Sequence, residues 1–161
     1  MVTVVIALGS NLGDRRYHLL RAIHELRFVV RVVRVSSIHE TAPVDAPEGS
    51  PPFLNTVLTG YTSLEPLALL DELLALEQRL GRVRRGTRNG PRVIDLDLIL
   101  HGATRMRTRR LTLPHPRAHE REFVLVPLRE VWSAVTAVTA FPPAAAAAAL
   151  CVRVSRTQSK R

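Results

Sequence analysis

The sequence predicts one α+β domain with a ferredoxin-like, split βαβ arrangement (βαββαβ) and a C-terminal extension. Three observations carry this prediction. The chain has 161 residues, a length typical of a single domain. Four short apolar runs are bounded by turn residues, as β-strands are. Two longer segments place apolar residues at helical spacing, and their positions between the runs give the split βαβ order.

The first predicted strand is the apolar run VTVVIAL at residues 2–8. Because it lacks a basic lead-in and a cleavage-like sequence, we interpret it as a buried strand and not as a signal peptide. The other strands are expected at residues 29–38, 53–61 and 93–100. No other apolar run is long enough to span a bilayer, so no membrane partner is expected.

Both predicted helices begin at recognisable residues. The first follows the sequence GSNLGD, in which Asp14 is a suitable N-cap. The second begins near Pro66, which suits a first helical turn, and ends at Gly81. Glu77 falls among the apolar positions of the second helix, so we expect it to be partly buried and to orient Arg82.

The last part of the chain has a weaker pattern. Residues 101–132 contain a basic stretch, a histidine between two prolines and the apolar run FVLVPL, which we interpret as strand-like. We assign residues 1–132 to the core of the domain. Residues 133–161 are rich in alanine, and we expect either a last surface helix or a disordered tail without a chemical role.

Charge and cysteine content narrow the partners and the compartment. A formal net charge of +9 and a pI near 11.4 favour anionic partners such as nucleotides, nucleic acid or acidic membranes. Lys160 is the lone lysine among many arginines, so genome base composition or a solvated surface explains the charge equally well. Cys151 has no second cysteine to pair with, and we expect a reducing, cytoplasmic environment.

Two carboxylates stand two residues apart in the apolar segment RNGPRVIDLDLIL at residues 88–100. In a strand, Asp95 and Asp97 share one face, together with Val93 and Ile99. The opposite face is expected to carry four apolar side chains: Ile94, Leu96, Leu98 and Leu100. A bland alternative is a half-solvated strand with an acidic outer face.

Arginines crowd the approach to this carboxylate pair, at Arg82, Arg84, Arg85, Arg88 and Arg92. Adjacent carboxylates repel each other unless a cation, a raised pKa or water offsets the repulsion. One guanidinium group can bind two phosphate oxygens at once, and it remains positively charged. The combination therefore favours a site where a divalent metal and a polyphosphate meet.

Six motifs in order resemble one family. They are GSNLGD, SSIHETAPV, PFLN, GRVR, RNGPRVIDLDLIL and LPHPRAHEREFVLVPL, and they span residues 4 to about 131. The family is the 6-hydroxymethyl-7,8-dihydropterin pyrophosphokinase of folate biosynthesis. The resemblance implies transfer of the terminal diphosphate of ATP to the hydroxymethyl oxygen of the pterin, with release of AMP.

The resemblance also implies roles for single residues. Asp95 and Asp97 would hold two Mg²⁺ ions, and Arg82 and Arg92 would act catalytically on the transferring phosphates. ATP, the co-substrate, would be bound by Arg84, Arg88, Leu98, Arg110, Thr112, His115 and Arg121. The pterin would be stacked between Phe53 and Phe123 and read at its edge by Thr41, Ala42, Pro43, Val44 and Asn55.

Several of these residues allow a plainer interpretation. His115 suits a structural turn, Phe53 and Phe123 suit an ordinary core, and the loop GRVRRGTRNGPR suits either a closing lid or a solvated turn. Two positions depart from the family's pattern. His39 stands where the family usually has tyrosine, and Asn89 stands where tryptophan is frequent.

Two other function classes fit the predicted fold. A nucleic-acid-binding module fits the positive charge, but aromatic residues are scarce and a central carboxylate pair would repel phosphate. A regulatory small-molecule-binding domain would not need Asp95, Asp97 and Arg92 together. We therefore expect two small-molecule partners, ATP and the pterin, no nucleic acid, and a monomer, with an oligomer left open.

Overall fold

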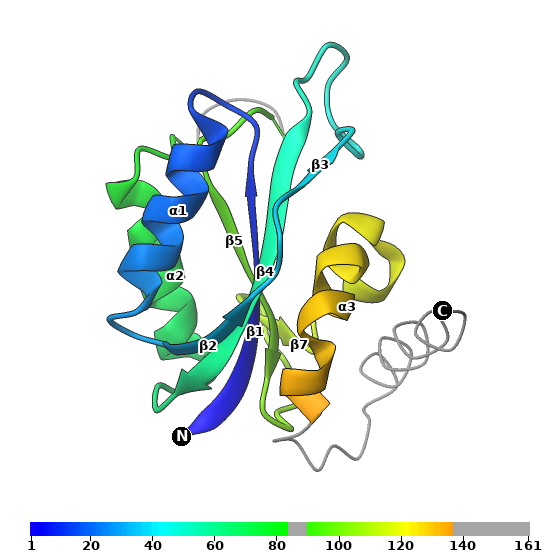
Figure 1. Cartoon of the computed structure of the whole chain (residues 1–161). Coiled ribbons are helices and arrows are strands. Elements are labelled where there is room, and N and C mark those ends of the chain that lie inside the picture. Colours follow the sequence, from blue (N-terminus) through cyan, green and yellow to red (C-terminus); the bar gives the residue numbers. More distant parts are fainter. Residues whose placement is uncertain (84–89, 137–161) are drawn as a thin grey trace, which may run out of the picture.

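The computed structural model of the chain describes residues 1–83 and 90–136, which form a mixed domain of an antiparallel sheet and three α-helices (Figure 1). Four strands form the sheet in the order β2-β4-β1-β5, and the short strand β3 pairs with one end of β4. Their bounds are β1 Val2–Ser10, β2 Arg31–Val35, β3 His39–Thr41, β4 Phe53–Thr62 and β5 Asp95–His101. A second small sheet consists of β6 Met106–Arg107 and β7 Thr112–Leu113.

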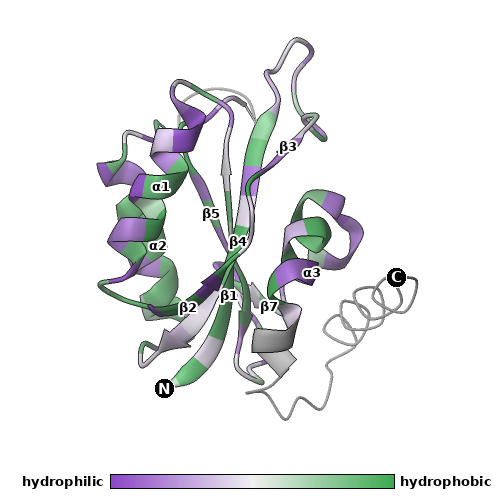
Figure 2. Ribbon diagram, viewed as in Figure 1, coloured by the Kyte–Doolittle hydropathy of each residue, from purple (hydrophilic) through white to green (hydrophobic). Residues whose placement is uncertain are grey.

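The helices cover the two faces of the main sheet. In Figure 1, α1 (Arg15–Leu26) and α2 (Pro66–Arg79) lie on one side of the strands and α3 (Glu122–Thr136) lies on the other, after the 3-10 helix η1 (Ala118–Glu120). Two clusters of buried apolar side chains fill the interfaces, one between the sheet and α1 and α2, the other between the sheet and α3. Figure 2 shows apolar residues along the central strands. The helices carry both apolar and hydrophilic residues.

The predicted helix starts are confirmed. The backbone N–H of Tyr17 donates to Asp14 Oδ1 at 3.0 Å, so Asp14 caps α1 as expected from a short polar side chain before an apolar repeat. Pro66 occupies the first turn of α2, where its missing N–H costs no helical hydrogen bond. Among the described residues, no helix has the length and hydrophobicity needed to cross a membrane.

The predicted faces of the last strand are partly wrong. Ile94, Leu96 and Leu98 lie in the cluster beneath α1 and α2, as expected. Leu100, however, lies with Ile99 in the cluster beneath α3. The pairing of β1 with β5 is irregular between Val5 and Ile6, and a bulge of this kind reverses the alternation of side chains beyond it. Val93 precedes β5 and packs against the first cluster, away from the carboxylate face.

The run FVLVPL is not a strand. It lies within α3, which also contains Pro127. Val124, Leu125, Leu128, Val131 and Trp132 are buried, and this set has helical spacing that a six-residue run alone does not reveal. The helix α3 continues to Thr136, past residue 132, and the rest of the predicted tail, residues 137–161, lies outside the described residues.

Candidate active site

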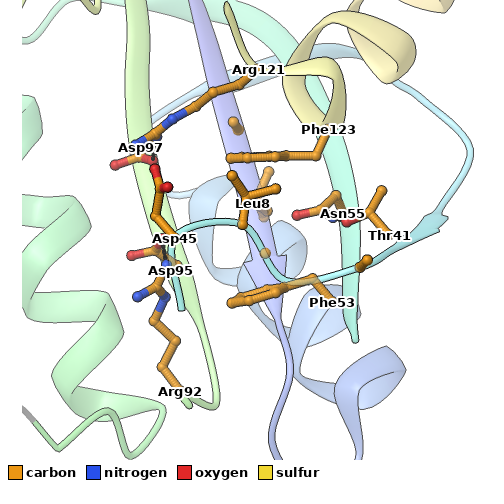
Figure 3. Close-up of a pocket in the computed structure, with 14 residues that line it drawn as sticks. Leu8, Thr41, Asp45, Phe53, Asn55, Arg92, Asp95, Asp97, Arg121 and Phe123 are labelled. Atoms are coloured by element: carbon orange, nitrogen blue, oxygen red, sulfur yellow. Dashed lines mark hydrogen bonds and ion pairs between the residues drawn. The ribbon is translucent and has the colours of Figure 1, made fainter. Parts of the chain in front are cut away.

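One cavity lies at the end of the sheet where β1, β4 and β5, the segment after β3 and the start of α3 meet (Figure 3). It is lined by most of the residues predicted to bind metal and pterin. Those lining residues are Thr41, Ala42, Val44, Phe53, Asn55, Arg92, Asp95, Asp97, Arg121 and Phe123. Residues more than eighty positions apart in the sequence therefore share one site.

The carboxylates of Asp95 and Asp97 both line the cavity, so the alternation predicted for β5 holds at these positions. Their strand is held by β1, where Gly9 is opposite Asp95 and Ala7 is opposite Asp97. Burial and then the charge of Asp95 raise the pKa of Asp97 to about 6. A cation beside the pair would reverse this cost, which is the behaviour expected of a metal-binding carboxylate pair.

Three arginines surround the two carboxylates. Arg82 Nη1 forms an ion pair with Asp95, and Arg92 Nη2 lies 3.1 Å from Asp95 Oδ2. Arg121 Nη1 lies 3.8 Å from Asp97 Oδ2. Burial lowers the pKa of Arg82, but the charges of Asp95 and Glu77 outweigh burial and raise it. Both carboxylates therefore have guanidinium partners.

Glu77 anchors this arrangement from beneath the sheet, and its predicted burial and pairing are confirmed. Its side chain is only 2% exposed. Its Oε1 accepts a hydrogen bond from Arg82 Nη1 at 2.5 Å and another from the backbone N–H of Leu96 at 2.8 Å. One carboxylate therefore fixes both Arg82 and the strand segment between Asp95 and Asp97.

Two aromatic rings face each other across the cavity. Figure 3 shows Phe53 and Phe123 with their ring planes nearly parallel, one from β4 and one from the first turn of α3. The guanidinium of Arg92 lies 5.2 Å from the Phe53 ring centre, and that of Arg121 lies 5.4 Å from the Phe123 ring centre. Each ring is thus coupled by a cation–π contact to an arginine that also pairs with a carboxylate.

The edge of this slot is polar, whereas Ala7 and Leu8 of β1 line the cavity with apolar side chains. Asn55 is buried, and its Nδ2 donates to Thr41 Oγ1 at 2.6 Å. Gly9 leaves the space that this arrangement needs, because a Cβ there would lie 3.0 Å from Asn55 Oδ1 and 3.5 Å from Phe53 Cδ1. Pro43 does not line the cavity, although its neighbours Ala42 and Val44 do.

Sequence reasoning missed Asp45 and Asn11. Asp45 lines the cavity with a φ of 52°, and Arg117 Nη2 donates to its Oδ2 at 2.8 Å, which lowers the pKa of Asp45. Asn11 is buried, accepts the backbone N–H of Arg92 at 2.8 Å and donates to the carbonyl of Pro51 at 3.2 Å. The motif GSNLGD marked the position of Asn11, but only the fold reveals that it joins two distant loops.

The predicted ATP-binding residues are more scattered. Arg110 is exposed and forms an ion pair with Asp71, and Thr112 lies on β7. His115 is partly buried, and burial followed by the charge of Arg121 lowers its pKa to about 4. The side chain of Leu98 faces the core beneath α1 and α2, which leaves its backbone for the predicted contact. Arg84, Arg85, Arg88 and Asn89 lie outside the described residues.

Comparison with known sequences settles the family. Residues 5–133 match the profile of 7,8-dihydro-6-hydroxymethylpterin-pyrophosphokinase (HPPK). The chain belongs to the HPPK family. The range matches the one spanned by the six motifs, so the predicted resemblance is confirmed.

Relatives of HPPK type resemble the chain over most of its length. It is 46% identical to the 2-amino-4-hydroxy-6-hydroxymethyldihydropteridine pyrophosphokinase of Bacillus subtilis, over 78% of this chain and 75% of that protein. It is 43% identical to the protein of the same name from Haemophilus influenzae, over 83% of each. The HPPK-DHPS crystal structure from Plasmodium falciparum has a similar fold, with a TM-score of 0.60 at 13% identity, over 80% of this chain and 40% of that chain.

Proposed function

We propose that this chain transfers the terminal diphosphate of ATP to the hydroxymethyl oxygen of 6-hydroxymethyl-7,8-dihydropterin and releases AMP, as a step of folate biosynthesis. The single observation that carries the proposal is the cavity, which combines an aromatic slot with a carboxylate pair surrounded by arginines. Membership of the HPPK family and the names of its relatives support the same activity.

The slot between Phe53 and Phe123 suits a flat pterin ring. Two facing aromatic rings recognise such a ring by stacking, and a few fixed polar groups then set its orientation. Asn55 has both donor and acceptor atoms, as the edge of a pterin requires. Thr41 fixes the orientation of the Asn55 amide, and the neighbouring backbone of residues 42–44 completes the edge contacts in this proposal.

The carboxylate pair suits two Mg²⁺ ions. Magnesium prefers hard oxygen ligands and uses few protein ligands when phosphates and water complete its coordination. Asp95 and Asp97 both line the cavity and would be the main protein ligands; within residues 1–83 and 90–136, no group of three or more His, Cys, Asp or Glu side chains is placed to hold a metal. When bound, the ions supply positive charge beside the reacting phosphates.

The proposed reaction forms one bond and breaks one. The hydroxymethyl oxygen bonds to the β-phosphorus of ATP, the bond from the β-phosphorus to the oxygen bridging it to the α-phosphorus breaks, AMP leaves, and the hydroxyl proton is released. In this proposal Arg82 and Arg92 stabilise phosphate charge as it develops: both pair with Asp95, and Arg92 also lines the cavity, whereas Arg82 does not. Positioning and charge supply most of the catalysis in such transfers.

The adenosine part of ATP would bind beyond the carboxylates. Arg121 lines the cavity beside Asp97 and would contact phosphate, whereas Arg110, Thr112 and His115 would contact the rest of the nucleotide. Arg84 and Arg88 keep their proposed role in closing over ATP. The lowered pKa of His115 keeps its imidazole neutral, so one ring nitrogen donates while the other accepts.

The proposal also includes the fold assignment, the bounds of the core, the oligomeric state, the location and the partners. The strand order β2-β4-β1-β5 with antiparallel neighbours supports the ferredoxin-like, split βαβ assignment. The core at residues 1–132, the monomeric state, the cytoplasmic location and the absence of a nucleic-acid partner remain predictions. Helices cover both faces of the sheet, which speaks against an RNA-binding sheet surface.

An assay of AMP tests the proposed function. Purified protein is incubated with ATP, Mg²⁺ and the hydroxymethyl-dihydropterin, and each component is omitted in turn. We expect AMP and pterin diphosphate in equal amounts, and only in the complete mixture. Formation of ADP, or AMP release that does not depend on the pterin, would contradict the proposal.

A further inference from the structure

A cluster of hydrogen bonds outside the cavity joins β3 to α3. His39 Nε2 lies 2.5 Å from Glu130 Oε1. The backbone N–H of Ser37 donates to Glu130 Oε2 at 2.7 Å, and the Ser37 hydroxyl lies 2.7 Å and 2.8 Å from the two carboxylate oxygens. One carboxylate on α3 therefore holds the segment at residues 37–39.

This segment leads directly into one wall of the aromatic slot. In the pairing of β3 with β4, His39 is opposite Asn55 and Thr41 is opposite Phe53. Thr41 also accepts the hydrogen bond from the Asn55 amide. Movement of β3 would therefore displace the residues proposed to read the edge of the pterin.

The opposite wall of the slot lies on α3 itself. Phe123 is in the first turn of this helix, and Glu130 follows it by about two turns, so the two side chains share one face of the helix. The hydrogen bonds to Glu130 thus connect the helix that carries Phe123 to the strand that supports Phe53 and Asn55. Hydrogen bonds to an ionised carboxylate are stronger than those between neutral groups.

We propose that Glu130 is a positioning residue for the pterin slot: by holding Ser37 and His39 it fixes the distance between the Phe123 wall and the wall formed by Phe53 and Asn55. The inference rests on the proposed function, because it concerns the same substrate. Burial raises the pKa of Glu130, but hydrogen bonds from the Ser37 backbone, the Ser37 hydroxyl and His39 outweigh burial and lower it. The two oxygens of an ionised carboxylate have enough lone pairs to accept hydrogen bonds from all three donors.

Substitutions at Glu130 test this role. Glu130→Ala removes all acceptors, whereas Glu130→Gln keeps the side-chain shape but leaves only one acceptor oxygen. The matched control is Glu25→Gln, which makes the same charge change on α1, across the sheet from α3. Calorimetry measures pterin affinity with saturating Mg²⁺ and α,β-methylene-ATP, which resists cleavage at the reacting bond, and measures affinity for the analogue separately.

We expect Glu130→Ala to weaken pterin binding about 10-fold and Glu130→Gln about 3-fold, since hydrogen bonds to charged groups contribute strongly. Affinity for the ATP analogue and both affinities of Glu25→Gln should stay within about 2-fold of the wild type. His39→Ala should weaken pterin binding in the wild type but have little further effect in Glu130→Ala, because both changes remove the same contact.

Three results would overturn the inference. A folded Glu130→Ala protein with wild-type pterin affinity would remove the positioning role, and equal losses of pterin and analogue affinity would indicate a general structural defect. If Glu130→Ala does not fold, Glu130→Gln decides by the same two criteria. Wild-type protein that binds no pterin would overturn the proposed function itself, and this inference with it.

Discussion

At the scale of a single residue, Arg92 connects the carboxylate pair to the aromatic slot. Its guanidinium pairs with Asp95 and lies over the ring of Phe53, and its backbone N–H and carbonyl both hydrogen-bond to Asn11. Its Nε is buried and has no hydrogen-bond partner within the described part of the chain. A buried donor without a partner has a free-energy cost, which a rearrangement of this side chain on ligand binding would remove.

Replacement of Arg92 by alanine should lower turnover more than it weakens ATP binding. A contact that strengthens in the transition state is lost mainly from kcat. We expect a fall of about 30-fold to 1000-fold, corresponding to roughly 2 to 4 kcal/mol. Steady-state kinetics and analogue calorimetry measure the two effects, with Arg34→Ala, an exposed position on β2, as the control. A loss confined to KM would mean that Arg92 only binds.

Asp97→Asn should abolish most activity and yet stabilise the metal-free protein at pH 7. The pKa of Asp97 is raised to about 6, so folding disfavours its ionised form, and its contribution to stability falls as the pH rises from about 4 to about 6. The asparagine side chain does not ionise, so the variant avoids this loss of stability. Turnover should fall by about 100-fold or more, as expected when a preorganised electrostatic group is removed.

Thermal unfolding in EDTA and turnover at saturating Mg²⁺ measure these two effects of Asp97→Asn. Glu25→Gln serves as the control for the change of charge. Near-normal turnover of the variant would contradict the metal-binding role of Asp97, and a lower unfolding temperature at pH 7 would contradict the pKa argument.

His115 should make stability depend on pH below neutrality. Its Nδ1 accepts the backbone N–H of Arg117 at 3.2 Å, which requires an unprotonated nitrogen, and its pKa is lowered from 6.5 to about 4. The unfolded chain therefore binds a proton at a higher pH than the folded chain. This contribution to stability is fully present above about pH 6.5 and is lost as the pH falls towards 4.

Urea unfolding of wild type and His115→Gln at several pH values measures this contribution. Because glutamine does not titrate, the wild type should lose stability relative to the variant as the pH falls from 6.5 to 4. A difference between the two proteins that stays constant over this range would show that His115 does not titrate as described.

At the scale of elements, the end of β1 is shaped by its neighbour β4. Gly9 is paired with Asn55, and the missing side chain at Gly9 gives room to Asn55 and Phe53. Gly60 has a different role, because a Cβ there would lie 2.5 Å from the backbone oxygen of Arg31. Gly9 therefore leaves room for residues of the site, whereas Gly60 allows β2 to pack against β4.

Gly9→Ala and Gly60→Ala should therefore differ in their effects. In Gly9→Ala the Asn55 amide must shift by a few tenths of an ångström, so we expect pterin affinity to fall about 10-fold with little change in stability. In Gly60→Ala the backbone must move, which should lower the free energy of unfolding by about 1 to 3 kcal/mol. Calorimetry and urea unfolding distinguish these outcomes, and the reverse pattern would refute them.

Elements with long, regular patterns were predictable, and short or irregular ones were not. The apolar repeats of α1 and α2 and the caps at Asp14 and Pro66 reveal both helices from local sequence alone. The local pattern did not predict β3, which is held by its pairing with β4. It also led to the wrong prediction of a strand for FVLVPL, because six residues are too few to show a helical period. The bulge in β5 depends on the register with β1, which no local pattern encodes.

At the scale of the whole molecule, the sheet brings the parts of the site together. The carboxylates come from β5, one ring from β4 and the other ring from α3, so the site exists only in the complete fold. Local sequence identified the chemistry of most lining residues through the family's motifs. It did not reveal Asp45, Asn11 or the Glu130 link, because those roles depend on contacts between segments far apart in the chain.

The crystal structure of the protein with α,β-methylene-ATP, Mg²⁺ and 6-hydroxymethyl-7,8-dihydropterin tests the central claim most directly. We expect the pterin between Phe53 and Phe123, metal ions on Asp95 and Asp97, and the hydroxymethyl oxygen directed at the β-phosphorus of the analogue. A pterin bound outside this slot, or metal and phosphates held away from the two aspartates, would contradict the account.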